Sequence, residues 1–209
     1  MNYTPEQIAS IVLKEIEAPD VSSLSYEQKI EILKDPNTPQ KTLELLATDD
    51  DYYWVRVKVA LNPNTPQKTL ELLATDEYSL VRGGVALNPN CPLKLLELLA
   101  TDKYSYVRGA VAQNPNTPQE TLELLATDEN SLVRQGVALN PNTPQKTLEL
   151  LATDEDTDVR WTVAKNPNTS QKTLELLATD KDSYVRGRVA QNPNTTEYIQ
   201  RLIIMTNAQ

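Results

Sequence analysis

Apolar residues recur along this chain in a unit of 26 residues, and the copy at 62–87 shows how each unit is organised. Within 66–75 they follow the i, i+4, i+7, i+8 spacing of a single helix face, which predicts a first amphipathic helix packed on a core. Leu72 lies off that face and is expected to pack sideways against the next repeat, while 67–69 (Gln-Lys-Thr) are expected to be exposed. The expected core positions of this helix are Pro66, Leu70, Leu73 and Ala74.

The residues before the first helix predict how it begins. Asn-Pro-Asn at 62–64 favours a turn, because an asparagine side chain can hydrogen-bond to the nearby backbone and proline cannot continue a helix. Thr65 is then expected to be the N-cap and Pro66 the first helical residue, where its missing N–H costs nothing. A later copy carries Cys91 in the slot of Thr65, so Cys91 is interpreted as a drifted cap residue rather than a reactive thiol.

A second, shorter helix is predicted over 80–87, partly 3₁₀ in character, after a connector in which Asp76 or Ser79 caps it. At about 100° per residue, Val81 and Val85 share the side of this helix that stays constant between copies. The positions on the other side, with the connector residue before the helix, vary from copy to copy, and we call them the variable stripe. In this unit the variable stripe comprises Tyr78, Leu80, Gly83, Gly84 and Leu87.

Six complete copies and half of a seventh fill most of the chain. A unit of this length buries its apolar face only against its neighbours, so the sequence predicts an all-α solenoid of six two-helix repeats of 26–27 residues over 35–191. The first prolines of the copies are Pro36, Pro63, Pro89, Pro115, Pro141, Pro167 and Pro193.

Both ends of the chain are predicted to be helical caps. An N-terminal cap is expected at 1–34, because the segments 4–17 and 25–34 both begin with capping-box spacing and run amphipathic. A C-terminal half-repeat at 192–209 is expected to seal the last unit, as terminal repeats of solenoids do. Its sealing residues are expected to be Ile199, Leu202 and Ile203.

The variable stripe collects most of the aromatic residues: both tryptophans, six of the nine tyrosines, and also all five glycines. Tyrosine and tryptophan supply large contact areas and lose little side-chain conformational entropy on binding, so the variable stripe is predicted to bind a partner. The predicted partner-binding residues are Tyr52, Tyr53, Trp54, Lys58, Tyr78, Leu80, Tyr104, Tyr106, Gln113, Leu132, Gln135, Asp158, Trp161, Lys165, Tyr184, Arg188 and Gln191.

Close packing and neutral drift are the two alternatives to a binding role for the variable stripe. Glycine inside a helix costs about 1 kcal/mol relative to alanine, so the five glycines reflect either close packing of neighbouring helices or a concave surface with room for large anchors. Neutral drift also produces variation, but it would scatter over the exposed positions of the first helix as well. Those positions, such as 67–69, are nearly the same in every copy.

Composition narrows the classes of function. A formal charge of −9 and a pI of about 4.6 argue against a phosphate-binding surface. With no histidine and one cysteine, neither a zinc or iron–sulfur ligand set nor a nucleophile–base pair can be assembled, so no cofactor, metal or catalytic residue is expected. No apolar run reaches the length of a membrane span, and the N-terminus has no leader pattern, so a cytoplasmic monomer is expected.

Two charged patterns are assigned to structure rather than to ligands. One arginine per repeat, such as Arg82, lies at the margin of the core, and each repeat also supplies an aspartate, such as Asp76. An Asp–Arg ladder that holds connectors to helices is therefore favoured over a row of basic side chains that binds phosphate groups. The acidic run at 154–158 lacks the glycine and glutamate of a calcium loop and is interpreted as helix capping.

The motifs Asn166-Pro167-Asn168, Leu174 to Asp180 and Val185-Arg186-x-x-Val189-Ala190 resemble the leucine-rich-repeat-variant family, and the resemblance covers roughly 35–194. It implies a right-handed superhelix of alternating α and 3₁₀ helices, more distantly similar to HEAT repeats. A known member of that family carries an N-terminal iron–sulfur segment with clustered cysteines, which this chain lacks, so no cluster is implied here. The resemblance implies the fold rather than the function, because solenoids of this kind are mostly binding surfaces.

The sequence therefore favours a non-catalytic scaffold that binds a protein or peptide through the variable stripe, whose mixed charges suit a protein partner. A single-stranded nucleic-acid reader, addressing one base per repeat, is the alternative, and the net negative charge disfavours it. A consensus-like scaffold with no ligand is the third hypothesis.

Overall fold

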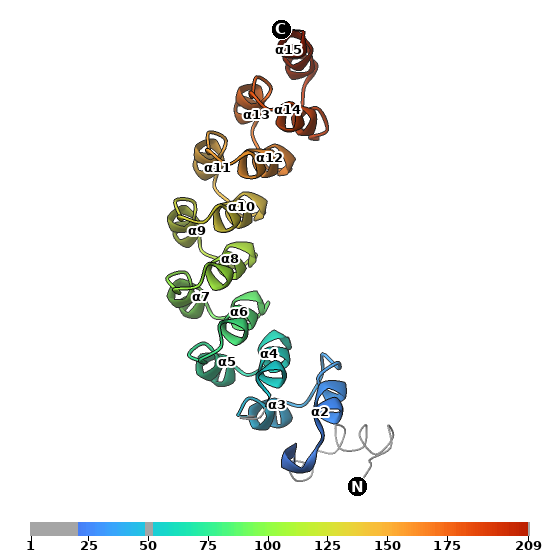
Figure 1. Ribbon diagram of the computed structural model, residues 1–209, viewed down its shortest axis with the longest axis vertical. Helices are drawn as coiled ribbons and strands as arrows, with labels where there is room; N and C mark the ends of the chain where they lie inside the picture. The colour runs from blue at the N-terminus through green and yellow to red at the C-terminus, as the bar shows by residue number, and fades with distance from the viewer. Residues whose placement is uncertain (1–20, 49–51, 209) are drawn as a thin grey trace. The chain divides into compact units, whose positions relative to one another are not determined.

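The computed structural model describes residues 21–48 and 52–208, and every regular element among them is a helix (Figure 1). The chain forms two compact units, unit 1 (Met1–Leu99) and unit 2 (Ala100–Gln209). The predicted cap helix at 4–17 lies outside the described residues. The longest of the described helices has 11 residues, and a membrane span needs about 20, so none of them is a candidate span.

Each unit alternates a seven-residue helix, here called helix A, with a helix of eight or nine residues, helix B. Within each unit the helices A lie beside one another and the helices B form a second layer (Figure 1), which confirms the predicted all-α repeat solenoid. Unit 1 comprises η1 (Val21–Ser23), α2 (Tyr26–Ile32), α3 (Gln40–Leu46), α4 (Tyr53–Leu61), α5 (Gln67–Leu73), α6 (Ser79–Leu87) and α7 (Leu93–Leu99). Unit 2 comprises α8 (Ser105–Gln113), α9 (Gln119–Leu125), α10 (Ser131–Leu139), α11 (Gln145–Leu151), α12 (Thr157–Lys165), α13 (Gln171–Leu177), α14 (Ser183–Ala190) and α15 (Glu197–Asn207).

The core lies between the two layers, and the predicted core leucines form it. Leu70 and Leu73 are each 1% exposed, and burying a leucine side chain contributes roughly 1.5–3 kcal/mol. Two neighbouring predictions are wrong. Leu72 is 52% exposed instead of packed, and Thr69 is buried instead of exposed, because Thr69 lies one turn before Leu73 on the same face.

Helix A begins one residue later than predicted, and Thr65 is not its N-cap. The buried hydroxyl of Thr65 donates instead to the carbonyl of Val59, at 2.6 Å, near the end of the preceding helix B. Pro66 takes the N-cap position with an extended backbone and no capping side chain, and the helix starts at Gln67. The threonine therefore satisfies a carbonyl that the end of helix B leaves without a partner.

Cys91 replaces this threonine, so its interpretation as a drifted cap is also wrong. The side chain is buried at 5% exposure, and its sulfur lies 3.8 Å from the carbonyl oxygen of Pro92. Burial raises the pKa of the Cys91 thiol to about 12. The thiol is therefore protonated at neutral pH and is a small apolar core residue, since the thiolate is the reactive form.

Helix B is α-helical throughout the described residues, and the predicted 3₁₀ character is absent from it. Its predicted caps are also wrong in unit 1, because Ser79 is already the first helical residue of α6 and the N-cap is Tyr78. Asp76 accepts the Tyr78 N–H at 2.9 Å and so orders the connector without capping the helix. In unit 2, by contrast, side chains do cap helices α10, α12 and α14. These capping residues are Asn130, Asp156 and Asp182, as the acidic run at 154–158 predicted for Asp156.

A ladder of asparagines joins consecutive repeats, and sequence analysis did not predict it. The side-chain amide of Asn140 donates to the carbonyls of Ala112 and Asn114, at 2.7 and 2.8 Å, at the end of the preceding helix B. Its side-chain oxygen accepts the N–H of Asn142 at 2.9 Å, which forms the predicted turn closed by an asparagine side chain. One asparagine thus closes its own turn and satisfies carbonyls of its neighbour. The equivalent donors in the described chain include Asn88, Asn166 and Asn192.

The predicted Asp–Arg ladder is confirmed, and it links one repeat to the next. Arg108 forms a bidentate pair with Asp128, with nitrogen–oxygen distances of 2.6 and 2.8 Å, and a third bond from Arg108 reaches the carbonyl of Asp102. An arginine in such a pair therefore ties its own connector to the aspartate of the following connector. Further such pairs include Arg56–Asp76, Arg134–Asp154 and Arg160–Asp180.

These pairs make stability depend on pH at the acid end. Burial by itself would raise the pKa of Asp128, but hydrogen bonds from Arg108 and from the Asn130 N–H outweigh it and hold the pKa below its ordinary value. The unfolded carboxyl titrates near about pH 3.9, so its stabilising contribution is present above that pH and is lost as the pH falls through the lower, folded pKa.

We expect the difference in unfolding free energy between the wild type and Asp128→Asn to stay constant from pH 7 to about pH 5 and to shrink as the pH falls further to 3. Urea denaturation of both chains at each pH measures it. A difference that stays constant down to pH 3 would contradict a charge-based role for Asp128.

The described ends carry the expected capping helices. Ser25 and Gln28 form the predicted capping box at the start of α2, with both reciprocal hydrogen bonds present. At the other end α15 buries Ile199 and Ile203, while Leu202 is half-buried. The division of the chain at 1–34, 35–191 and 192–209 stays a prediction.

Candidate partner-binding surface

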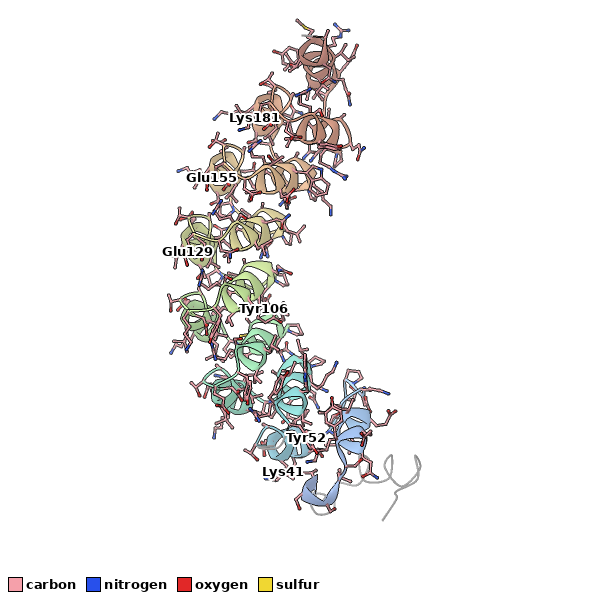
Figure 2. The ribbon with its side chains drawn as sticks, in the orientation of Figure 1. Lys41, Tyr52, Tyr106, Glu129, Glu155 and Lys181 are labelled. Atoms are coloured by element: carbon pink, nitrogen blue, oxygen red, sulfur yellow. The ribbon has the colours of Figure 1, made fainter. Side chains whose placement is uncertain are left out.

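The first and last variable positions of helix B, the slots of Trp54 and Leu61, form the exposed part of the variable stripe. At the first position Trp54, Tyr106 and Tyr184 are 46%, 50% and 79% exposed. Figure 2 shows Tyr106 on the helix-B side of unit 2, with Glu129 and Glu155 along the helix-A side. At the last position the exposed residues are Leu61, Leu87, Gln113, Leu139, Lys165 and Gln191.

The two middle positions of the variable stripe are mostly buried, which corrects the prediction that the whole stripe faces a ligand. A Cβ on Gly84 would lie 3.1 Å from the Cβ of Ala60, and one on Gly136 would lie 3.0 Å from the Cβ of Ala112. These two glycines allow neighbouring helices B to approach each other, so close packing explains them. Around Gly109 and Gly187 a Cβ would meet nothing within 4 Å, so packing does not explain those two.

Three helices B follow a tyrosine whose side chain does not cap them. Tyr52, Tyr78 and Tyr104 occupy the N-cap of α4, α6 and α8, make no side-chain cap bond there, and are 43%, 43% and 47% exposed. Asparagine or aspartate holds this position in α10, α12 and α14 and does cap the helix. A capping side chain contributes typically about 1 kcal/mol. The chain therefore forgoes stability at three positions where it exposes an aromatic ring.

In unit 1 these rings lie in contact with one another. Tyr53 stacks on Tyr78, with ring centroids 4.6 Å apart, and lies 5.1 Å from Trp54. Tyr52 lies 5.1 Å from Tyr26 of α2, a ring that the repeat pattern did not predict because α2 belongs to the cap. Mutual stacking fixes the ring orientations before a partner arrives, which reduces the entropy lost on binding.

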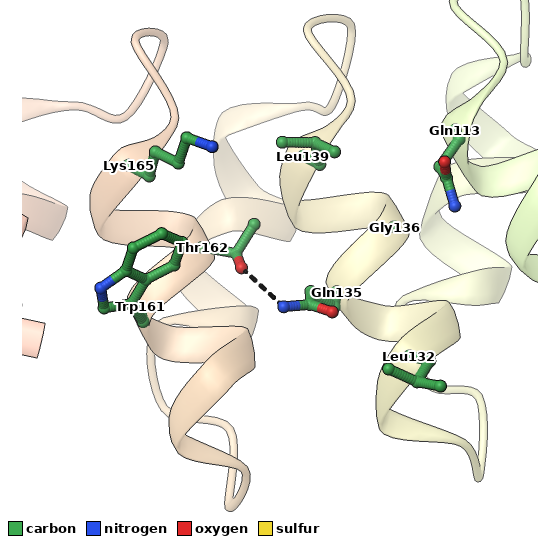
Figure 3. Close-up of a pocket in the computed structure, with 8 residues that line it drawn as sticks. All are labelled: Gln113, Leu132, Gln135, Gly136, Leu139, Trp161, Thr162 and Lys165. Carbon is green, nitrogen blue, oxygen red and sulfur yellow. Dashed lines mark hydrogen bonds between the residues drawn. The ribbon is translucent and has the colours of Figure 1, made fainter.

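In unit 2 the variable stripe encloses a pocket of about 220 Å³ between α8, α10 and α12 (Figure 3). Gly136 and Thr162 line it at the middle positions, and Gln135 donates to the Thr162 hydroxyl at 3.3 Å. The volume is below the roughly 300–1,000 Å³ of small-molecule sites, so it suits one or two side chains. The other lining residues are Gln113, Leu132, Leu139, Trp161 and Lys165.

Two cations flank Trp161 at the edge of this pocket. The guanidinium carbon of Arg188 lies 4.3 Å from the ring centroid, and the Lys165 ammonium lies 5.6 Å from it. Trp161 is consequently half-buried rather than fully exposed as its wheel position predicted. Cation–π contacts of this kind stabilise by about 0.5–2 kcal/mol.

The structure places the predicted residues in two groups, one in each unit. The group in unit 1 comprises Tyr52, Tyr53, Trp54 and Tyr78, and the group at the pocket in unit 2 comprises Gln113, Leu132, Gln135, Trp161 and Lys165 with Arg188 beside them. The remaining predicted residues are not among the members of these two groups. Lys58, Asp158, Tyr184 and Gln191 are exposed and Leu80 is half-buried. Leu139 and Thr162 were not predicted as site residues, although their places in the repeat marked both as variable.

Within 21–48 and 52–208, no three histidine, cysteine or acidic side chains are grouped closely enough to hold a metal ion. Asp154, which sequence analysis weighed as part of a calcium loop, is engaged instead with Arg134 and with the Asp156 N–H.

Three segments of the chain match the family model described as leucine rich repeat variant, at 53–77, 107–130 and 132–156. A solved structure described as a leucine-rich repeat variant with a novel repetitive protein structural motif is 27% identical to the chain, with a TM-score of 0.62. That similarity covers 88% of this chain and 77% of the other. No curated protein sequence matches the chain.

Proposed function

The chain belongs to the leucine-rich-repeat-variant family, and we propose that it is a non-catalytic scaffold that binds a protein or peptide through the exposed part of its variable stripe. The observation that carries this proposal is the set of exposed tyrosines at the helix-B N-caps. Tyr78 and Tyr104 stand where Asp156 and Asp182 cap their helices in other repeats. A sequence that breaks a local rule in one stripe, while its other positions obey it, points to selection for contact.

Charge favours a polypeptide partner over a nucleic acid. The net charge is −9, and most arginines of helix B are neutralised by the aspartate ladder, as Arg108 is by Asp128. Nucleic-acid binding relies on unpaired basic side chains that neutralise phosphates. Exposed aromatic rings beside leucines are instead typical of the anchors that dominate protein interfaces.

Replacing Tyr104 with asparagine should separate stability from binding. Asparagine caps the equivalent helix at Asn130, so Tyr104→Asn should leave the unfolding free energy unchanged or raise it by up to about 1 kcal/mol. Affinity for peptides selected on the wild-type chain from a displayed random library should fall by about tenfold or more, as for loss of an aromatic anchor. Urea denaturation and fluorescence anisotropy measure the two quantities.

Tyr198→Ala is the matched control, because Tyr198 is 59% exposed on α15 and lies outside the variable stripe. It should leave the affinity unchanged. Equal affinities for the wild type and Tyr104→Asn would count against the proposal. Failure to select any peptide, together with salt-dependent binding of single-stranded DNA, would favour nucleic-acid reading, and failure of both would favour a scaffold with no ligand.

A further inference from the structure

The cations beside the unit 2 pocket lack the carboxylate partners that Arg108, Arg134 and Arg160 have in the same unit. Arg134 and Arg160 are each paired with an aspartate. Neither the ammonium group of Lys165 nor the guanidinium group of Arg188 forms a hydrogen bond or ion pair with any described residue. The Nε atom of Arg188 is, among the described residues, the one buried side-chain nitrogen or oxygen without a hydrogen-bond partner.

A buried donor without an acceptor is unusual, because an unpaired buried polar group destabilises the folded state. The ring of Trp161 attracts the guanidinium but offers no lone pair in its place. Trp161 and Arg188 are also departures from the repeat that occur together. Their slots hold Gly109 and Gly136 in earlier copies, so both large side chains appear where adjacent repeats bring them into contact.

The pocket itself offers chemistry suited to a peptide. Leu132, Leu139 and the Trp161 ring supply apolar walls. The side-chain amide of Gln113 makes no hydrogen bond within the described chain. Figure 3 shows Gln113 and Gln135 on neighbouring helices along the same pocket. Side-chain amides can both donate to and accept from a peptide backbone.

Resting on the proposed function, we infer that this pocket selects an acidic peptide segment, with an apolar side chain in the pocket and an adjacent carboxylate on Lys165 and Arg188. Carboxylate pairing with arginine is charge-assisted and directional. It would supply the acceptor that the Arg188 Nε lacks.

The test uses the full chain carrying Trp54→Phe, in which Trp161 is the only tryptophan, so that indole emission reports on this site. Three hexapeptides serve as probes, in which leucine alternates with glutamate, glutamine or lysine. The glutamate peptide should change the Trp161 emission and bind about tenfold more tightly than the glutamine peptide, the factor that about 1.4 kcal/mol produces. The lysine peptide should bind least.

The double variant Lys165→Gln, Arg188→Gln should abolish the preference for glutamate over glutamine. Lys172→Gln is the matched control, because Lys172 is an exposed cation on helix A whose side chain is 81% exposed, and it should keep the preference. Circular dichroism and thermal melting confirm that both variants fold. If the double variant does not fold, Asp158→Asn replaces it as the test of charge selection. Removing this exposed acidic group from α12 should tighten binding of the glutamate peptide.

Equal affinity for the three peptides would overturn this inference and leave the proposed function standing. So would binding that never alters Trp161 emission while the Tyr104 experiment succeeds. A thymidine oligonucleotide that perturbs Trp161 more strongly than the glutamate peptide would also overturn it, in favour of a phosphate ligand.

Discussion

Replacing Arg134 with alanine is expected to lower the free energy of unfolding by about 3–5 kcal/mol, the cost of removing one partner of a buried ion pair. The Arg134 and Asp154 side chains are 10% and 8% exposed, and two nitrogens of Arg134 contact the carboxylate at 2.7 and 2.9 Å. Arg134 also donates to the carbonyl of Asp128 at 2.8 Å. Its loss removes two donors from a buried carboxylate, which keeps the Asp156 N–H, and one donor from a backbone carbonyl. Chemical denaturation of the full chain measures the change.

Two further variants show whether the fork geometry matters. Arg134→Lys keeps the charge but cannot form the two parallel bonds, so it should recover less than half of the lost stability. Lys172→Ala breaks the exposed Lys172–Glu149 pair and should change stability by about 0.5 kcal/mol or less. If Arg134→Ala costs no more than Lys172→Ala, the ladder does not hold the repeats together.

Replacing Asn140 with aspartate should destabilise the chain by about 3 kcal/mol or more, although the two side chains have nearly the same shape. The Asn140 amide donates to two carbonyls, and a carboxylate can donate to neither. Aspartate would also place a charge at a position that is 1% exposed and faces carbonyl oxygens. The loss should be largest above the pKa of the new carboxyl and smaller in acid, where the protonated group can donate one bond.

The matched control is the same chemical change at Asn130. Asn130 caps α10 by accepting the Leu132 N–H, and Asp156 and Asp182 likewise accept backbone N–H groups at the N-caps of α12 and α14. Asn130→Asp should therefore change stability by about 0.5 kcal/mol or less. Comparable losses in the two variants would mean that the asparagine ladder adds nothing beyond ordinary turn formation.

The two ladders explain why the exposed part of helix B is free to vary. Arg134 and Asn140 lie on one short helix B and at the turn that follows it, and both join neighbouring repeats through side chains directed away from the variable stripe. Packing and registration of repeats thus depend on constant residues. Leu132 and Leu139 on the same helix are exposed and can change without disturbing either ladder.

The sequence by itself determined the repeat, the helix periods, the buried leucines and the pairing of arginine with aspartate. These follow from local rules, since residues such as Leu70 and Leu73 recur at helical spacing and a core needs one apolar face. The exposed positions of Trp54 and Tyr106 followed from the same helical wheel. The sequence also placed the residues of the unit 2 pocket in one stripe, although it could not reveal a pocket.

Only the tertiary structure decided what neighbouring repeats do to each other. Thr65 has the right type and place for an N-cap, but a carbonyl of the preceding helix competes successfully for its hydroxyl. Gly136 is explained by a helix that lies 24 residues earlier in the chain, at Ala112, and Asn140 by carbonyls 26 and 28 residues away. Contacts between residues so far apart in the sequence depend on how closely neighbouring repeats approach in space. This spacing between repeats is fixed by packing and is not encoded in the period of any single helix.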